Sequence, residues 1–473
     1  MENFAGYLSF TDAECGRLLD AVKELPDAEN TLVFYIVGDN GASSEGGMQG
    51  TVNEVMNLNG VPSRLEDTLK ELDKIGEPDT EPHYPVGWAW AGNAPFQWVK
   101  QVASHFGGSR NPMVVSWPKR IKDNGGIRSQ FTHLIDIAPT ILDVAGIPAP
   151  KSVDGIAQKP MDGVSIASTF ASARAKPVRE RQYFEIISNR AIYDKGWIAA
   201  AQHTLPWRQD LANGNWQNDK WELYNIDEDF SEANDLAAKN PKKLAAMKKL
   251  FDQEAKKNHV FPLDDRGAAR LAVPKPPPGG SDPKRTKFTY FEGASRLPEN
   301  AAPNTKNRSH RITAVIEMPK RGGDGVIVAE GGVSAGFSLY VKDGKLVYHY
   351  NWFGRERTNL VSKEPLPAGE STVTMEFAYD GGGLGKGGEA VIGINGKEVG
   401  RARIANTVAG RFGIDTFGVG SDTGAPVADT YEAPFPFAGK IKRVEIELGP
   451  TNLSAEDEKK LHQMATAFAG AHE

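Results

Sequence analysis

The chain has 473 residues, which is too long for one ordinary domain and predicts two or three. Its net charge of −6 argues against a nucleic-acid partner, because such proteins usually carry a basic field. The longest apolar run, Leu32 to Val37, is far below the roughly 20 residues of a membrane helix. The single cysteine, Cys15, excludes an intrachain disulfide. The N-terminus does not read as a signal peptide, so we expect a cytoplasmic location and no membrane.

The first part of the chain predicts an α/β fold. Apolar residues at helical spacing predict a helix, and the run 32–37 then predicts a buried strand, typical of a parallel sheet covered on both faces. Residues 42–92 are polar and irregular, so we expect a long insertion that sets substrate selectivity. A second strand is predicted at 113–117, followed by a helix that ends at Gly146. We therefore expect residues 1–180 to be part of an α/β domain.

The remainder predicts a small subdomain and then a β-sandwich. Short strands followed by an amphipathic helix predict an antiparallel subdomain over residues 181–265. Prolines are dense in residues 266–300, which we expect to be a stiff linker. Many short strands with glycine turns predict a β-sandwich with a terminal helix over residues 301–473. The Asp-Gly pair at 343–344 and the Asn-Gly pair at 395–396 are strong hairpin signals within it.

Two oxygen-bearing side chains directly follow the first predicted strand. Asp39 and Asn40 come at its carboxyl end, where open α/β sheets place their ligand sites. A carboxylate and an amide oxygen are hard ligands that suit Ca²⁺ or Mg²⁺. The alternative is that Asp-Asn-Gly is only a turn.

Five segments in a fixed order extend this observation over about residues 7–260. They are NTLVFYIVGDNG, WVKQVASHFGGSRNPMVVSWP, THLIDIAPTILDV, MDGVSI and WELYNIDEDFSEANDL. In this order the segments resemble the C-terminal portion of the type I, formylglycine-dependent sulfatases. The strands after residue 300 resemble, with weaker motifs, the concanavalin-like extension of larger bacterial arylsulfatases.

The resemblance implies a fold and an activity. The fold would be a partial alkaline-phosphatase-like α/β sandwich with a small C-terminal subdomain, followed by a concanavalin- or laminin-G-like β-sandwich. The activity would be that of an arylsulfatase-type hydrolase, which converts a sulfate monoester to an alcohol or phenol plus sulfate. The implied metal is Ca²⁺, and the implied substrate is a small-molecule or glycan sulfate ester.

The resemblance also assigns roles to individual residues. Asp39 and Asn40 match metal ligands, and Asp39 would also contact the nucleophile. Lys100 matches the lysine that binds the sulfate group, and His105 in the same loop is a lesser catalytic candidate. The alternatives are a solvated lysine on a helix face for Lys100 and a structural role for His105. We expect Arg110 to brace its loop through carboxylates or carbonyls.

One departure from the family concerns the nucleophile. Type I sulfatases make it from the Cys or Ser of a Cys/Ser-x-Pro-x-Arg motif, and Cys15 lies in ECGRLLD, which lacks the proline and arginine. We expect no Ser-x-Pro-x-Arg version of the motif elsewhere in the chain. The tandem aspartates of the first family strand are also absent. The expectation is therefore a chain that lacks the N-terminal catalytic half and is inactive alone, with an exposed flank and an unpaired edge on the strand 32–37.

Two other interpretations remain open. The chain could be a sulfatase-derived module that binds glycans or a protein without catalysis, using aromatic residues of the sandwich; these are Tyr340, Tyr348, Tyr350, Trp352 and Phe353. The alternative for these residues is strand core. A nonfunctional fragment is the third interpretation, and it predicts insolubility. We expect His203 to pack or to line a substrate rim, without a catalytic role.

Overall fold

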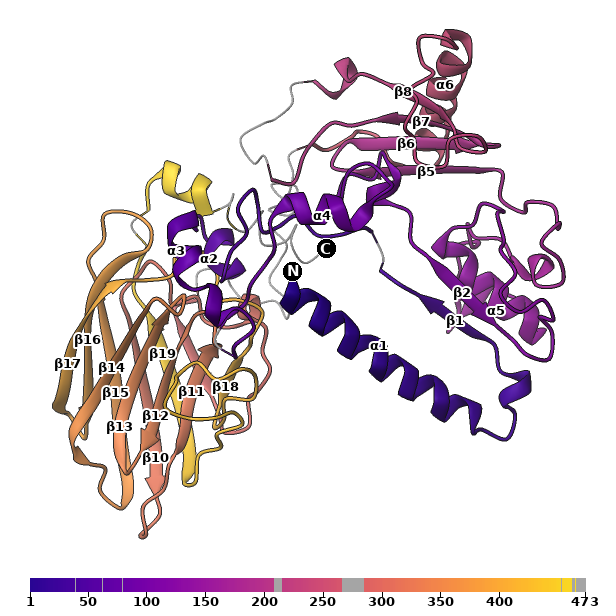
Figure 1. Ribbon diagram of the computed structural model, residues 1–473. Helices are drawn as coiled ribbons and strands as arrows, with labels where there is room; N and C mark the ends of the chain where they lie inside the picture. Colours follow the sequence, from indigo (N-terminus) through magenta and orange to yellow (C-terminus); the bar gives the residue numbers. More distant parts are fainter. Residues whose placement is uncertain are drawn as a thin grey trace. The chain divides into compact units, whose positions relative to one another are not determined.

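The structure is a computed structural model that describes residues 1–38, 40–61, 63–78, 80–207, 215–265, 285–451, 453–461 and 464. They form two compact units (Figure 1), and the chain passes between them more than once. The first unit is Met1–Ser44 with Val86–Asp265, and the second is Glu45–Pro85 with Arg266–Glu473. None of the helices among the described residues combines the length and apolar character that a membrane crossing requires.

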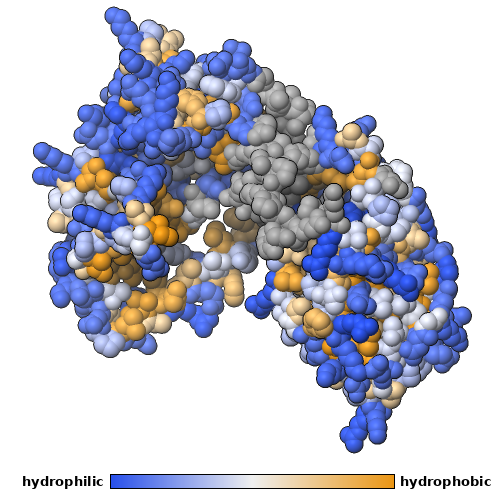
Figure 2. Space-filling view, turned by 180° about the vertical axis from the view of Figure 1, so that it is seen from behind, coloured by the Kyte–Doolittle hydropathy of each residue, from blue (hydrophilic) through white to orange (hydrophobic). Residues whose placement is uncertain are grey.

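The first unit begins with a long helix and a short β-ladder. Helix α1 (Glu2–Lys23) has no buried residue, and its exposed apolar side chains include Phe4, Tyr7, Leu8, Phe10 and Leu18. Strand β1 (Val33–Ile36) pairs antiparallel with β2 (Met113–Ser116) in a two-stranded sheet. Figure 2 shows orange, hydrophobic surface on the unit that contains these elements.

The prediction that the run 32–37 forms a strand of a parallel sheet, buried on both faces, is wrong. Only one face of the ladder is covered, where Phe34 and Val115 pack against a cluster of Trp117, Ile166 and Phe170. Strand β1 pairs with β2 along one edge, and no other described strand pairs with its second edge. The expected exposed flank and unpaired edge are present in the described residues.

One further element of this unit agrees with the prediction from the sequence. Helix α5 (Ile137–Ala145) ends at Gly146, whose φ of 69° is the left-handed cap that glycine favours. The small hairpin that follows joins β3 (Ser152–Val153) and β4 (Ile156–Ala157).

The small subdomain has the predicted antiparallel sheet. Its strands follow chain order and are β5 (Arg181–Ile186), β6 (Asn189–Asp194), β7 (Trp197–Ala201) and β8 (Glu222–Asn225). Helix α6 (Pro241–Lys257) covers one face through Met247, Phe251 and Ala255. Phe106 packs on strand residues that include Ala191 and Ala200. Because neighbouring residues Ala191 and Ile192 point to opposite faces, the sheet is covered on both sides.

The second unit is a sandwich of two antiparallel sheets. One sheet contains β17 (Lys397–Asn406), β16 (Lys386–Ile394), β15 (Gly369–Tyr379), β10 (His310–Met318), β19 (Lys440–Leu448) and β9 (Lys287–Tyr290). The other contains β14 (Glu356–Pro365), β13 (Lys345–Trp352), β12 (Gly336–Lys342), β11 (Gly325–Gly331) and β18 (Phe417–Val419). Both predicted hairpins are present, and Asp343 and Asn395 have φ values of 50°, as a type I′ turn requires. Residues 455–461 are helical, and most of the remaining predicted terminal helix lies outside the described residues.

The domain boundaries differ from the prediction in two places. Residues 45–85, expected to be a loop of the α/β domain, belong to the sandwich unit and contain α2 (Glu54–Leu58) and α3 (Leu65–Lys70). Strand β9, placed in the linker by the sequence, pairs with β19 inside the sandwich. Most of the predicted linker, 266–284, lies outside the described residues.

The inserted segment, residues 45–85, is fixed to the sandwich by apolar side chains that enter the sandwich core and by hydrogen bonds. Val55, Met56 and Leu58 are buried in the main sandwich core. The Asn53 side chain caps α2 by accepting from the Met56 N–H at 3.1 Å. Its amide group donates to the carbonyls of Ser334 and Phe353, both at 3.1 Å. Burial of the apolar residues drives the docking, and the hydrogen bonds fix its register.

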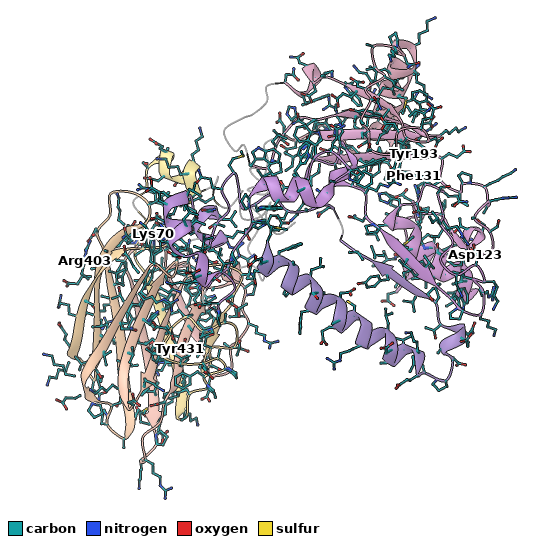
Figure 3. All side chains as sticks on the ribbon, viewed as in Figure 1. Lys70, Asp123, Phe131, Tyr193, Arg403 and Tyr431 are labelled. Carbon is teal, nitrogen blue, oxygen red and sulfur yellow. The ribbon has the colours of Figure 1, made fainter. Side chains whose placement is uncertain are left out.

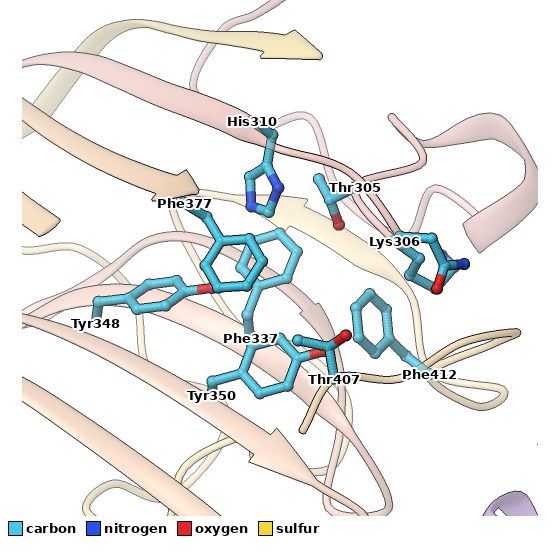
Figure 4. A pocket seen from close by; sticks show the side chains of 10 residues that line it. Thr305, Lys306, His310, Phe337, Tyr348, Tyr350, Phe377, Thr407 and Phe412 are labelled. Atoms are coloured by element: carbon cyan, nitrogen blue, oxygen red, sulfur yellow. The ribbon is translucent and has the colours of Figure 1, made fainter. Parts of the chain in front are cut away.

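Polar groups also lie inside the sandwich. Figure 4 shows a cavity of about 10 Å³ lined by His310, Tyr348 and Tyr350, among others. Lys306 pairs with Glu299 at 2.6 Å, and both side chains are 5% exposed. Glu330 is buried, and neither carboxylate oxygen has a hydrogen-bond partner among the described residues. Burial raises the pKa of Glu330 to about 8, so the carboxyl is mainly neutral at pH 7.

Candidate functional site

The turn that contains Asn40 meets a second turn some sixty residues later. Gly41 has a φ of 91°, and a Cβ there would lie 1.9 Å from the Gly107 carbonyl oxygen. Only glycine allows this approach. The Lys100 N–H donates to the Ala42 carbonyl at 3.1 Å. The backbone segments that carry Asn40 and Lys100 are therefore in direct contact.

One amide side chain fastens both turns. Asn93 is the last residue of α4 (Val86–Asn93), and its Oδ1 accepts from the Ala42 N–H at 3.0 Å. Its Nδ2 donates to the carbonyls of Trp98 and Gly107, each at 3.0 Å. Asn93 was not singled out from the sequence, since nothing in GNAPF indicates such distant partners.

Lys100 lies in a turn and not on a helix, which excludes the helix-face alternative. Its backbone follows α4 and precedes the short turn Phe106–Gly108. Trp98 and Gln101, on either side, have φ values of 69° and 73°. Such left-handed conformations cost non-glycine residues about 1–2 kcal/mol each. Strain of this kind persists only where surrounding contacts hold it, and it gathers at functional sites.

The implied metal site is incomplete among the described residues. Asp39 lies outside them, and Asn40 is half-buried at the turn. Together the two would supply two oxygen ligands, whereas Ca²⁺ takes about six to eight. No described group of three or more His, Cys, Asp or Glu side chains is placed to hold a metal ion. The described residues do not form a complete Ca²⁺ site.

The geometry favours the structural alternative for His105 over the catalytic one. The side chain is fully buried. Its Nε2 lies 3.1 Å from Glu222 Oε2, and its Nδ1 lies 3.0 Å from Ser104 Oγ. The hydrogen bond to His105 is the largest cause that lowers the pKa of Glu222, to about 2. His105 thus ties the loop to β8.

Two ionisable residues, Glu232 of the subdomain and Arg110 at the end of the loop, stabilise the same loop. Glu232 is fully buried and accepts from the Phe106 N–H at 2.8 Å. Arg110 places its guanidinium over the rings of Phe96 and Phe230, at 5.3 and 4.1 Å from their centroids. Arg110 therefore braces the loop as expected, but chiefly through aromatic rings.

Other residues of the five segments connect the segments to one another. Asp136 is fully buried and accepts from the Val164 N–H at 2.9 Å, which joins the fourth segment to the third. Its carboxylate also pairs with Arg179. His203 is buried with its Nδ1 2.9 Å from Asp219, which agrees with the expected packing role. These contacts are structural.

The expectation that the chain has no Ser-x-Pro-x-Arg motif is wrong. Residues 116–120 read Ser-Trp-Pro-Lys-Arg, so the chain is not devoid of the pattern. Ser116 pairs with Val33, whereas the end of the ladder next to Asn40 is the Ile36–Met113 pair. The three residue steps between these pairs, at about 3.3 Å each, separate the two ends of the ladder by roughly 10 Å. Ser116 is thus at the end of the ladder remote from Asn40.

A larger cleft of about 460 Å³ also lies away from Lys100. It is lined by Gln130, Phe131 and Tyr193, among others, and Figure 3 shows the last two side by side near β5. Their rings stack with centroids 3.9 Å apart. The cleft reaches the turn after β6, whereas Asn189, at the start of β6, bonds to the Gln101 carbonyl.

Two family models match the first 259 residues of the chain. Residues 1–147 match the family model described as Sulfatase, and residues 97–259 match that of N-sulphoglucosamine sulphohydrolase, C-terminal. The two matches together span residues 1–259, and by them this part of the chain is a member of the sulfatase family.

Individual relatives are distant. An uncharacterized sulfatase of Schizosaccharomyces pombe is 27% identical over 58% of this chain and 47% of its own length. An arylsulfatase of Klebsiella aerogenes is 27% identical over 36% of this chain and 34% of its own length. The chain thus spans less than half of these relatives. Laminin α1 domains LG4-5 from mouse match 36% of this chain and 44% of theirs with 17% identity, but the TM-score of 0.24 carries no argument.

Proposed function

We propose that this chain takes part in the hydrolysis of sulfate monoesters to an alcohol or phenol plus sulfate, as an arylsulfatase-type enzyme. The observation that supports the proposal is the contact between the Asn40 and Lys100 turns, held by Asn93. An ammonium group beside an oxygen ligand for a divalent cation suits a sulfate group, since both cations stabilise negative charge on its oxygens. The substrate is a small-molecule or glycan sulfate ester.

The proposal assigns limited roles to this chain. Asp39 and Asn40 would hold part of the coordination shell of a divalent cation, proposed to be Ca²⁺, which would polarise the sulfate oxygens. Lys100 would bind the sulfate group and support the leaving oxygen. The nucleophile would come from another polypeptide segment, because Cys15 lacks the motif and Ser116 lies at the remote end of the β1–β2 ladder.

The test is sulfate release from an aryl sulfate with Ca²⁺. The chain is assayed alone, and then co-expressed with the product of the DNA immediately upstream and a formylglycine-generating system. Activity in the second case that is lost in Asn40→Ala and Lys100→Ala supports the proposal, with the exposed Lys122→Ala as a control. Absence of activity in both cases counts against it.

The alternative of a non-catalytic binding module has no comparable support. Tyr340, Tyr348, Tyr350 and Phe353 are all less than 7% exposed and belong to the sandwich core, as the structural alternative expected. Trp352 packs against the same core and is partly exposed, so of the five aromatic residues it alone offers part of its ring at the surface.

A further inference from the structure

Helix α6 presents a straight row of lysines on the face opposite to its packing surface. Its buried side chains, Met247, Phe251 and Ala255, face the subdomain sheet. Lys242, Lys249 and Lys256 recur every seven residues and are exposed. At 100° per residue, the centre of this row lies about 160° around the helix axis from the centre of the buried stripe. Consecutive lysines are roughly 10 Å apart along the axis at about 1.5 Å per residue.

The charge of this helix is unlike that of the whole chain. Pro241–Lys257 contains six lysines and two acids, whereas the chain carries a net charge of −6. Lys257 pairs with Glu254 at 3.8 Å. In the described residues, no ion pair involves Lys242, Lys249 or Lys256. The row is thus a concentrated positive strip on an acidic protein.

The surroundings of the row suit an extended ligand. Besides Lys248, the exposed residues between Lys242 and Lys249 are the small Ala245 and Ala246, and those between Lys249 and Lys256 are Asp252 and Gln253. On the two flanks of the helix, about 100° around its axis from the row, Lys243 lies 5.4 Å from the ring of Trp197, and Lys248 lies 5.7 Å from that of Trp221. Both tryptophans are partly exposed. These flanking lysines add positive charge on both sides of the row.

From these observations we propose that the outer face of α6 binds a linear sulfated polysaccharide, away from the site of hydrolysis. The choice of a polysaccharide over a nucleic acid rests on the proposed function. The face is separated from the Lys100 loop by the subdomain sheet, because α6 and Phe106 pack on opposite faces of it. The strip would therefore hold a polymeric substrate near the enzyme without touching the reacting ester.

Binding of the full-length chain to heparin over a range of NaCl concentrations tests this inference without any need for hydrolysis. The variant K242Q/K249Q/K256Q is compared with K320Q/K363Q/K397Q, which removes the same charge from exposed positions of the sandwich. Each lysine that contacts a polyanion adds about one unit to the slope of log Kd against log salt. We expect the α6 variant to lose about two to three units, and the sandwich variant to keep the wild-type slope.

Several outcomes would overturn the inference. Equal losses in the two triple variants would mean general cation exchange. Binding to desulfated heparin as tight as to heparin would mean that sulfate groups are not recognised, and tighter binding to DNA than to heparin would identify a nucleic-acid surface. Heparin binding without sulfate release would leave the inference standing while the proposed hydrolysis failed, so the two results are separable.

Discussion

The carboxylate of Glu232 accepts a hydrogen bond from the Phe106 N–H across 126 residues of sequence, at 2.8 Å. The bond connects the small subdomain to the loop that carries Lys100. Burial is the largest cause that raises the pKa of Glu232, to about 7, against the lowering effect of His105 and the Phe106 N–H. The other carboxylate oxygen has no hydrogen-bond partner among the described residues.

This pair predicts a pH-dependent stability of the first unit. Since the folded-state pKa of Glu232 exceeds its ordinary value of about 4.5, the stability it contributes is complete below about pH 4.5 and is lost as the pH rises through about 7. Glu232→Gln keeps an acceptor for Phe106 and should remove this loss. Glu232→Ala leaves the buried N–H unpaired and should cost about 1–3 kcal/mol. Urea unfolding at pH 5 and 8 measures both, and identical pH profiles for wild type and Glu232→Gln would contradict the assignment.

The Asn53 contacts predict that the inserted segment stabilises the sandwich. Asn53→Ala removes the cap of α2 and leaves the Ser334 and Phe353 carbonyls without this donor, a loss of about 2–4 kcal/mol. Hydrogen exchange measured by mass spectrometry should show faster exchange in α2 and in β12–β13. Asn57→Ala, which removes an acceptor for Ser63 within the segment, is the control. Faster exchange in α2 alone would mean that the segment does not support the sheets.

The interior of the sandwich predicts a second pH dependence. Glu330 has a pKa raised to about 8 by burial, so its contribution to stability is complete below about pH 4.5 and is lost as the pH rises through about 8. Glu330→Gln should therefore flatten the loss of stability of the sandwich between pH 5 and 9. Glu370→Gln, at an exposed position, should leave the wild-type profile. Hydrogen exchange of β11 at the two pH values is the measurement, and an unchanged profile in Glu330→Gln would contradict the prediction.

Substitution of Lys100 should affect activity, whereas substitution of His105 should affect stability. Lys100 is half-buried in a turn, whereas His105 is fully buried between Glu222 and Ser104. His105→Ala leaves the Glu222 carboxylate without this partner and creates a cavity, at a cost of about 2–4 kcal/mol. It should lower Tm clearly. Lys100→Ala should change Tm little and abolish sulfate release in the complemented assay. Full activity in Lys100→Ala would remove this lysine from the sulfate site.

The sequence predicted those parts of the fold that depend on local signals. The Asp343-Gly344 turn needs left-handed backbone, which these residues adopt without help from the rest of the chain. The prediction of the two strands that flank this turn was therefore correct. The predictions of helix α6, from the spacing of its apolar residues, and of the end of α5 at Gly146 were also correct, because both depend on local signals. The apolar run ending at Val37 identified a strand but not the direction of its neighbour, because burial patterns do not encode strand pairing.

Long-range contacts were beyond sequence reasoning. Asn53 and Ser334 are 281 residues apart, and the polar texture of their segment resembles any surface loop. Asn93 was missed likewise, although it fixes the turns of Asn40 and Lys100. The assignments of Asn40 and Lys100 came from resemblance, and they remain predictions that the proximity of the two turns supports. Asp39 lies outside the described residues.

The path of residues 45–85 has a consequence for how this protein can be divided. A protease that cut between residues 266 and 284 would not release the sandwich, because the chain still enters it at Glu45 and leaves it at Pro85. A gene fragment that started at residue 285 would encode a sandwich without Met56 and Leu58, two of its interior side chains. The two units are interleaved in the gene, so neither can be moved to another protein as a simple terminal cassette.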